Sequence, residues 1–134
     1  MNGNNDFGVS FSRISWLGTA IEGHPNVASF TRSDDIFFHI IRAQGEAIRL
    51  VCLDEYACGL TRVRESLDAF PAANFIYVGG NWNGYTSEAK EFCLGAQLGL
   101  YNSSEIMGAL YRKDFWAYHK RDDNGNPSYP FNNR

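Results

Sequence analysis

The sequence predicts an α/β domain of two or three layers built on a central, mainly parallel β-sheet. Three units follow one another in the middle of the chain, each an apolar run followed by a stretch with helical spacing of apolar residues. The apolar runs are Ile48–Leu53, Phe75–Val78 and Leu98–Tyr101, and the helical stretches are Gly59–Phe70, Thr86–Ala96 and Ser104–Tyr111. Strands that alternate with helices of this length are typical of parallel pairs joined by right-handed crossovers. Folds of this kind carry many functions, so the fold class alone predicts no reaction.

The N-terminal segment is expected to add one or two strands to a single domain that spans residues 1–134. Residues 1–6 are rich in Asn, and we expect them to be disordered. Apolar residues alternate with Gly and Ser over residues 7–11, which indicates a strand. Val27–Phe30 indicates a second short strand.

A helix is predicted after these strands. Ser33 is followed by Asp34 and Asp35, which is typical of a helix start, because a serine caps the backbone and carboxylates favour the positive end of the dipole. The apolar positions that follow have helical spacing, and Gly45 ends the helix. These apolar positions are Phe37, Ile40 and Ile41.

The C-terminal segment 114–131 is expected to form a β-hairpin. Aromatic residues flank the pair Asn124-Gly125, and both of these residues tolerate the positive φ angles of a tight turn. The acidic run beside this pair lacks the alternating ligand positions and the distal Glu of a calcium loop, so no metal is expected there.

Composition limits the class of protein. The chain has 134 residues, 44% apolar and 20% charged, which fits one ordinary globular domain. The formal charge of −3 gives no overall attraction to nucleic acid or to an anionic membrane. No apolar run reaches the roughly 18 residues that cross a bilayer, and the N-terminus lacks the pattern of a secretory signal. We therefore expect a cytoplasmic protein.

The three cysteines, Cys52, Cys58 and Cys93, are expected to be buried thiols in a reducing compartment, because an odd number argues against a disulfide framework. The three histidines lie far apart in the chain, and no Cys/His grouping has the spacing of a zinc site. No metal or cofactor is expected.

Polar residues follow all three strands of the predicted parallel sheet. They are Asp54 and Glu55 after the first strand, Asn81, Trp82, Asn83 and Tyr85 after the second, and Asn102 after the third. Ligands bind outside the carboxyl ends of such strands, so these side chains could recognise a sugar, a base or a nucleotide. The alternative is that Asn and Gly make turns and that Ser103 or Ser104 caps a helix.

Asp54 and Glu55 are the best-placed candidates for acid/base chemistry. Adjacent residues on a strand point to opposite faces, so the two carboxylates are not expected to act together. An enzyme working at this edge would use one of them, with Asn81, Trp82 and Asn83 holding the substrate.

Residues 84–93 read Gly-Tyr-Thr-Ser-Glu-Ala-Lys-Glu-Phe-Cys, and Leu98–Tyr101 and Glu105–Met107 follow. This stretch resembles the C-terminal half of Mrr-like restriction endonuclease domains, in the PD-(D/E)XK superfamily. In element order the resemblance covers roughly residues 48–110. In that family a strand leads to a G-[FY]-T-x-x-A helix start, then to a short strand and a final helix.

The resemblance implies an Asp on one strand and a Glu/Gln-x-Lys on the next, which hold a metal and position water. The corresponding strand is Ile48–Leu53, which carries neither the ligand nor the lysine. Glu88-Ala89-Lys90 spells the motif on a predicted helix, where residues two apart lie about 200° apart around the axis. The resemblance therefore implies a member with a degenerate, catalytically inactive site.

We accordingly expect a non-catalytic binding protein, which the resemblance places in bacterial defence, toxin–immunity or nucleic-acid-handling systems. The expected contact surface is aromatic and basic and is formed by Tyr111, Arg112, Lys113, Trp116, Tyr118, Lys120 and Arg121. Aromatic residues and arginine carry binding energy at protein interfaces and stack on single-stranded nucleic acid, so the partner is another protein or a nucleic acid.

Three alternatives stay open. The chain could be a small-molecule or nucleotide-binding enzyme with its site at the strand ends. It could be an obligate homo-oligomer whose aromatic surface is a subunit interface. The C-terminal hairpin could also only close the sheet edge and bury its rings in the core.

Overall fold

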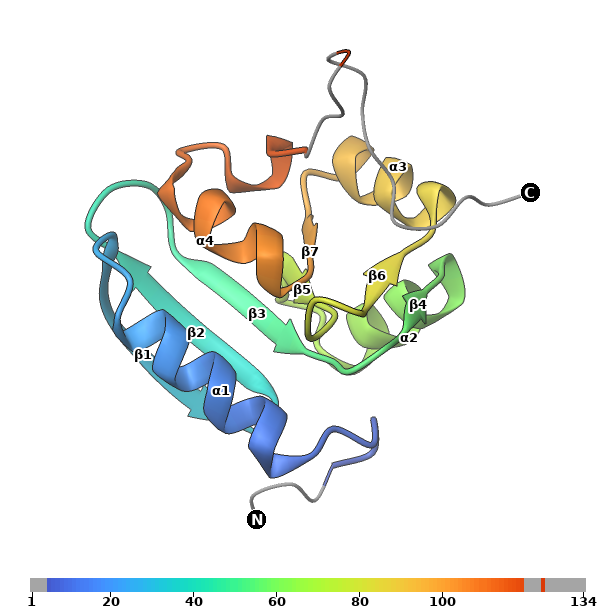
Figure 1. The fold of residues 1–134 in the computed structure, drawn as a ribbon, viewed down its shortest axis with the longest axis horizontal. Coiled ribbons are helices and arrows are strands. Elements are labelled where there is room, and N and C mark those ends of the chain that lie inside the picture. The colour runs from blue at the N-terminus through green and yellow to red at the C-terminus, as the bar shows by residue number, and fades with distance from the viewer. Residues whose placement is uncertain (1–4, 120–123, 125–134) are drawn as a thin grey trace.

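The computed structural model describes residues 5–119 and 124, and it confirms the α/β class (Figure 1). The helices of this part of the chain are α1 (Phe11–Glu22), α2 (Leu60–Ala69), α3 (Ser87–Gly95) and α4 (Ser103–Tyr111). The strands are β1 (Val27–Ser33), β2 (Phe37–Arg42), β3 (Ile48–Cys52), β4 (Ala57–Cys58), β5 (Phe75–Tyr77), β6 (Gly84–Tyr85) and β7 (Gly99–Tyr101).

The main sheet has five strands in the order β1-β2-β3-β5-β7, and β4 and β6 form a small parallel sheet of their own. The parallel pairing predicted for the middle of the chain is confirmed, because β3 pairs with β5 and β5 with β7 in parallel. The β1-β2 and β2-β3 pairs are antiparallel, so the whole sheet is mixed. The side chains of β5 and β7 are all buried, which explains why these strands are continuous apolar runs.

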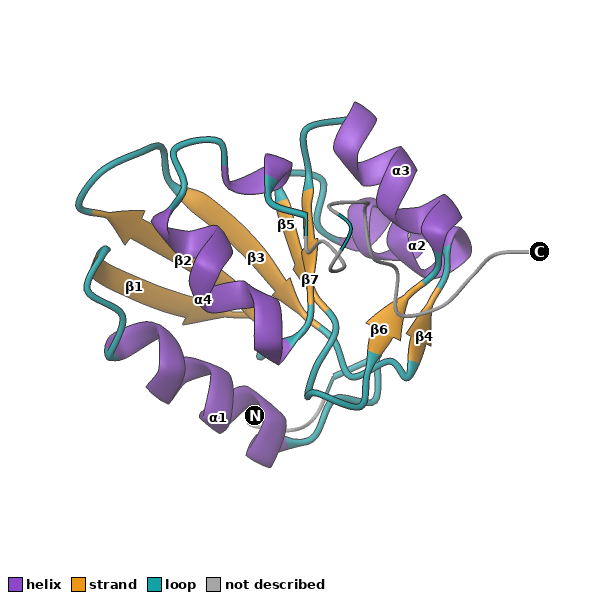
Figure 2. Ribbon diagram, turned by 45° about the horizontal axis from the view of Figure 1, so that its top comes forward, coloured by secondary structure: helices purple, strands orange, loops and turns teal. Residues whose placement is uncertain are grey.

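Helices α1 and α4 lie over the same face of the sheet (Figure 2). Ile14, Leu17 and Ile21 recur at intervals of three and four residues along α1, and all three are buried in the core. On the opposite face Phe37 of β2 stacks on Phe70 at the end of α2, with ring centroids 5.0 Å apart. The sheet is therefore covered on both faces beside α2.

The predicted strand over residues 7–11 is wrong, because Phe11 begins a helix. Ser10 is the N-cap, and its Oγ accepts a hydrogen bond from the backbone N–H of Arg13 at 3.3 Å. Burial of the apolar residues at helical spacing in α1 decides the local structure over the short alternation of apolar and small residues before it. Asn5, which was expected to be disordered, is held by a hydrogen bond from its Nδ2 to the carbonyl of Val9 at 2.8 Å.

The predicted helix from Ser33 to Gly45 is also wrong, because this segment forms most of the β1–β2 hairpin. Ser33 pairs with Phe37 across the turn, and Asp34 and Asp35 have φ angles of 48° and 66°. The turn has three residues, Asp34, Asp35 and Ile36, and Asp tolerates positive φ angles better than most residues. The predicted strand over Val27–Phe30 is confirmed as part of β1.

The three strand–helix units are confirmed to within a few residues. The strands β4 and β6 were not predicted, because each is only two residues long and leaves no alternation to recognise. Most of the predicted C-terminal hairpin lies outside the described residues. The part that is described contains a 3₁₀ turn, Phe115–Ala117, whose Phe115 is buried. None of the helices in the described part of the chain is long and apolar enough to cross a membrane.

Candidate binding site at the strand ends

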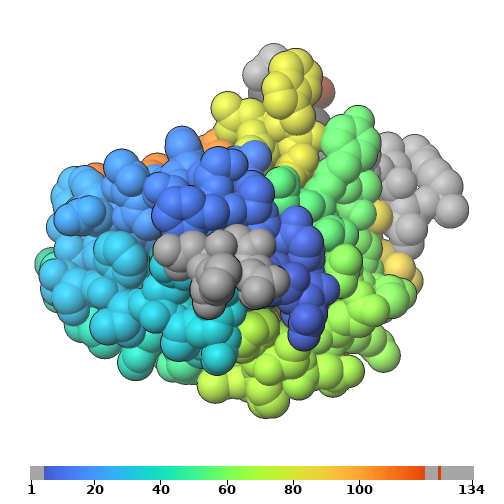
Figure 3. Space-filling model, turned by 90° about the horizontal axis from the view of Figure 1, so that it is seen from below, coloured from blue at the N-terminus to red at the C-terminus, as the bar shows by residue number. Residues whose placement is uncertain are grey.

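The carboxyl ends of β3, β5 and β7 meet at one edge of the sheet, and α1 packs beside them. The space between these elements is a hollow of about 310 Å³. It is lined by Arg13, Trp16, Gly80, Asn81, Trp82 and Ser103, which we call the strand-end site. Figure 3 shows the segment around residue 80 (yellow) protruding beside α1 (blue).

The loop after β5 is fixed at both ends. Within it, the N–H of Asn83 donates to the carbonyl of Gly80 at 2.9 Å, which closes a turn. The side-chain amide of Asn83 donates to Asp54 Oδ1 at 2.6 Å and to the carbonyl of Val78 at 3.0 Å. Asn102 Nδ2 donates to the carbonyl of Asn83 at 3.0 Å. The turn is therefore attached to the end of β3, the end of β5 and the start of α4.

This fixed turn presents an indole to solvent. Trp82 is 89% exposed, which is the largest value for any large apolar side chain in the described residues. Trp16, which is 43% exposed, stacks on Tyr77 with a centroid distance of 6.2 Å and an interplanar angle of 8°. Two exposed indoles at one hollow leave apolar surface in water, which is typical of a contact surface.

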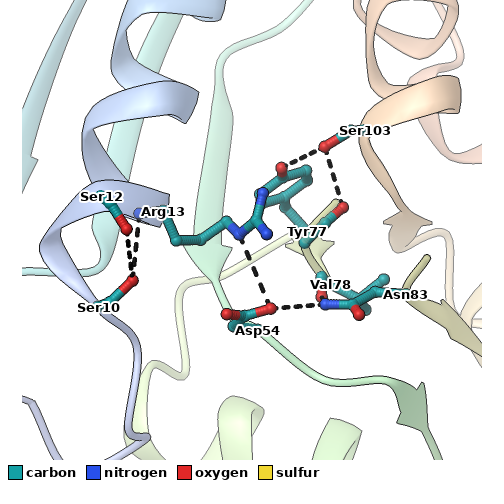
Figure 4. A network of polar contacts seen from close by, with 9 residues as sticks. Ser10, Ser12, Arg13, Asp54, Tyr77, Val78, Asn83 and Ser103 are labelled. Carbon is teal, nitrogen blue, oxygen red and sulfur yellow. Dashed lines mark hydrogen bonds and ion pairs between the residues drawn. The ribbon is translucent and has the colours of Figure 1, made fainter. Parts of the chain in front are cut away.

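Arg13 lines the hollow and is held in place by Asp54. Its Nε lies 3.7 Å from Asp54 Oδ1, so the two groups form an ion pair. This Nε is buried and has no hydrogen-bond partner within the described residues. The two terminal nitrogens lie against Gly80, where an added Cβ would come within 3.0 Å and 3.2 Å of them. Figure 4 shows the guanidinium between Tyr77 and Asp54.

A short hydrogen-bond chain continues from Tyr77. Its hydroxyl lies 2.5 Å from Ser103 Oγ, and Ser103 donates to the carbonyl of Gly79 at 3.0 Å. The Tyr77 hydroxyl therefore donates to Ser103. Burial raises the pKa of Tyr77, and the bond to Ser103 opposes this only in part, so Tyr77 is a neutral donor at pH 7.

The N-terminus of α4 is closed by a capping box. Asn102 is the cap rather than Ser103 or Ser104, and its Oδ1 accepts from the N–H of Ser104 at 3.0 Å. Glu105 Oε1 accepts from the N–H of Asn102 at 3.0 Å, and the N–H of Ser103 donates to Gly79 at 2.8 Å. Because these donors are engaged, the helix end offers little to an anion.

Two of the five predicted ligand-binding residues, Asn81 and Trp82, line the hollow. Asn83 fixes the turn instead of facing a ligand. Tyr85 is fully buried and donates to Glu105 Oε2 at 2.6 Å, and Asn102 is buried in the cap.

The two predicted carboxylates diverge, as expected for neighbours at the end of a strand. Asp54 is engaged by Arg13 and Asn83, whereas Glu55 Oε1 lies 3.3 Å from Arg62 Nε on α2. The two groups do not share a site.

Sequence reasoning missed Arg13, Trp16 and the contribution of Ser103 to the hollow. The first two were missed because their segment was not predicted to be helical. The spacing of Ile14, Leu17 and Ile21 was the available signal, since it fixes the buried face of α1.

The strand that the resemblance implies as the ligand-bearing one is buried except at Arg49, which is half-buried. Leu50, Val51 and Cys52 of β3 have no exposed surface. Within the described residues no group of three or more His, Cys, Asp and Glu side chains could hold a metal ion.

Lys90 lies apart from the hollow and is also fully buried. Its Nζ donates to the carbonyl of Leu100 at 2.9 Å and lies 3.8 Å from the ring centroid of Tyr101. Burial lowers the pKa of Lys90 to about 8, and Glu105 partly opposes the shift. Glu88 is exposed, so Glu88 and Lys90 do not face one site, as their helical spacing predicts.

The predicted C-terminal contact surface is partly folded into the domain. Tyr118 packs on Tyr101, with ring centroids 5.8 Å apart, and the guanidinium of Arg112 lies 5.0 Å from the Tyr118 ring centroid. Tyr111 is 59% exposed and contacts the ring of His24. Lys113 is exposed and Trp116 is half-buried, whereas Lys120 and Arg121 lie outside the described residues. The described residues of this surface begin at the C-terminal end of α4, whereas Ser103 of the strand-end site is at the N-terminal end of the same helix.

Comparison with protein-family models, with curated proteins and with solved structures finds no match to this chain.

Proposed function

We propose that this protein is a non-catalytic binding protein whose principal contact surface is the strand-end site. The observation that carries the proposal is the fixed turn that holds Trp82 in solvent beside Trp16 and Arg13. Tryptophan and arginine side chains that are held in place dominate the energy of many interfaces, because little freedom is lost when they bind.

The state of the carboxylates supports a binding role. Asp54 is occupied by Arg13 and Asn83, and Glu55 is paired with Arg62. Each carboxylate is therefore paired with a guanidinium, which ties it to a structural contact.

The resemblance to Mrr-like domains fits the same proposal. The order of a short strand, a capped helix, a strand and a final helix over β6, α3, β7 and α4 is the order that the resemblance implies. Because β3 carries neither an acidic ligand nor a lysine, such a member would bind without cutting. We extend the proposal to a role in bacterial defence, toxin–immunity or nucleic-acid handling, in a reducing compartment that suits three free thiols.

The C-terminal surface stays a second candidate for the partner. Tyr111 and Lys113 are exposed, and Arg112 presents a cation over the Tyr118 ring. Ser103 of the strand-end site and Tyr111 of this surface stand at opposite ends of α4, about 12 Å apart along the helix axis, and Lys113 follows Tyr111. Single substitutions can therefore test the two surfaces independently.

The test is a comparative pull-down from the native host with immobilised wild type, Trp82→Ala and Lys113→Glu, in which retained proteins and nucleic acids are both identified. Trp82→Ala removes an exposed side chain and is expected to lose species that wild type and Lys113→Glu retain. Loss with Lys113→Glu alone would place the partner on the C-terminal surface. Metal-dependent cleavage of the retained nucleic acid that Asp54→Asn abolishes would show an enzyme instead.

A further inference from the structure

We propose that the strand-end site binds a nucleoside 5′-phosphate, with the base against the indoles and the phosphate on Arg13. The inference rests on the proposed function and names the ligand class of that site. It follows from the combination of two exposed indoles and one guanidinium around a single small hollow.

The indoles are suited to stacking on a base. Trp16 is supported from behind by Tyr77, and Trp82 stands on a turn that is fixed at both ends. Stacking of a base on an aromatic ring contributes about 1–3 kcal/mol and needs no particular base. The volume of about 310 Å³ is at the small end of ligand pockets, so the site would take one nucleotide unit.

Arg13 is suited to the phosphate. Asp54 holds the guanidinium from the Nε side, and the two terminal nitrogens lie beside Gly80, which lines the hollow. The same guanidinium also interacts with the Tyr77 hydroxyl, so a phosphate would share its donors with that group. Two parallel N–H donors match the oxygens of a phosphate. The N–H groups at the start of α4 are engaged in the capping box, so Arg13 has to supply the recognition of the charge.

The polar groups of the rim suit the remainder of a nucleotide. The hydroxyl of Ser103 donates a hydrogen bond to the carbonyl of Gly79 and accepts one from Tyr77, so its oxygen can accept one more hydrogen bond. Asn81 offers an amide that both donates and accepts at the same rim. Such groups fit ribose hydroxyls and base edges without selecting strongly for one base.

A free mononucleotide and the 5′-phosphorylated end of a single strand share this chemistry. Titration calorimetry on the full chain separates them with five probes, namely thymidine, thymidine 5′-monophosphate, inorganic phosphate, hexathymidylate and 5′-phosphorylated hexathymidylate. We expect the monophosphate to bind at least about ten-fold more tightly than thymidine. Tighter binding of the phosphorylated hexamer than of the monophosphate would identify a strand end, and equal binding would identify a free nucleotide.

Arg13→Gln is expected to reduce the affinity for the monophosphate to that for thymidine, while Arg13→Lys, which keeps the charge but not the paired donors, is intermediate. Trp82→Ala is expected to weaken both ligands about ten-fold. Because Trp82 is exposed, this variant tests the site without a folding defect. Arg64→Gln, an exposed position on α2, is the matched control and keeps wild-type affinity.

Equal affinity of wild type for thymidine and its monophosphate, or unchanged affinity in Arg13→Gln, would overturn the inference. So would the absence of binding by every probe at millimolar concentration. If no probe binds but retention of the host partner still depends on Trp82, the nucleotide inference fails and the proposed function stands. If Trp82→Ala changes neither the affinity for nucleotides nor the retention of the host partner, the nucleotide inference and the proposed function both fail.

Discussion

Lys90 is the single residue whose charge is least compatible with its surroundings. Its ammonium has one carbonyl acceptor, Leu100, and two aromatic neighbours, Tyr85 and Tyr101. The pKa of Lys90 falls from 10.5 to about 8 on folding, so between these values the unfolded chain binds more protons than the folded one. The penalty of burying the charge is therefore fully present below pH 8 and disappears as the pH rises toward 10.5.

Lys90→Met should expose this penalty. The free energy of unfolding of wild type minus that of the variant is expected to rise between about pH 8 and pH 10, by up to about 1.4 kcal/mol per pH unit. Urea denaturation of both proteins at several pH values measures this difference in the free energy of unfolding. The variant has to be compared with wild type because the buried thiols lower the stability of both proteins above pH 9. A pH-independent difference, as expected for the exposed control Lys113→Met, would contradict the account.

Arg42 shows how one cation can fix several chain segments. It is buried and donates to the carbonyls of Glu46 and Leu110 at 3.0 Å and 3.2 Å, and it also donates to the carbonyl of Arg112. Its guanidinium lies 5.5 Å from the ring centroid of Phe115. The forked geometry of arginine is what allows these bonds to coexist.

Arg42→Lys is therefore not conservative here. We expect it to lower the free energy of unfolding by about 2–4 kcal/mol, because an ammonium cannot reach all the carbonyls and leaves some of them buried without a donor. Arg64→Lys on the exposed face of α2 should change stability by less than about 0.5 kcal/mol. Equal stability of the two variants in urea denaturation would disprove this role of Arg42.

At the scale of elements, the middle of the chain could be predicted from the sequence, whereas in the N-terminal part only β1 could be predicted, and α1 and β2 could not. The apolar residues are continuous in β3 and β5 and have helical spacing in α2, and turn residues mark where each segment ends. In β2, by contrast, Phe37, Ile40 and Ile41 fit helical spacing as well as a strand, and pairing with β3 decides between the two.

The same limit applies to the candidate site. Asn81 and Trp82 could be predicted because they follow a recognisable strand. The spacing of apolar residues could have predicted the helix that carries Arg13 and Trp16, but not that α1 packs across the sheet so that both reach the hollow. Contacts between distant segments leave no periodic signal in the sequence.

Asn102 links the α4 cap to the turn that carries Trp82, and its two roles can be separated. Asn102→Ala is expected to lower the free energy of unfolding by about 1–2 kcal/mol, because the cap is lost. Asn102→Ser should recover most of this stability, since Ser is also a good cap, but it loses the bond to the carbonyl of Asn83.

Amide hydrogen exchange of Asn83 reports on the turn. Its N–H should exchange faster in both variants than in wild type, although only Asn102→Ala is destabilised. Wild-type exchange in Asn102→Ser would show that the turn does not depend on this bond.

At the scale of the whole molecule, all three thiols belong to the core. Cys52, Cys58 and Cys93 are free and buried, as the sequence predicts. Burial raises the pKa of Cys58 and of Cys93 to about 12 and raises that of Cys52 as well. Because the unfolded thiols titrate near 9.0, they lower the stability of the fold above that pH.

These thiols should react only through unfolding. At pH 8 a thiol-specific disulfide reagent is expected to label the native protein at a rate that rises with urea concentration, whereas the unfolded protein reacts at once at all three sites. Rapid labelling of one thiol in the native protein, independent of urea, would show that a cysteine is accessible.

The tryptophans report on the two candidate surfaces of the molecule. Trp16 and Trp82 line the strand-end site, and Trp116 belongs to the C-terminal surface. The chain has three tryptophans, so its indole N–H signals in a proton–nitrogen correlation spectrum can be assigned with single Trp→Phe variants.

Titration of the labelled protein with 5′-phosphorylated hexathymidylate, followed through these three signals, tests most directly whether ligands bind at the strand-end site. We expect the signals of Trp16 and Trp82 to move together to saturation while that of Trp116 stays in place. Movement of the Trp116 signal alone, or three unmoved signals at millimolar ligand, would contradict nucleotide binding at the strand-end site.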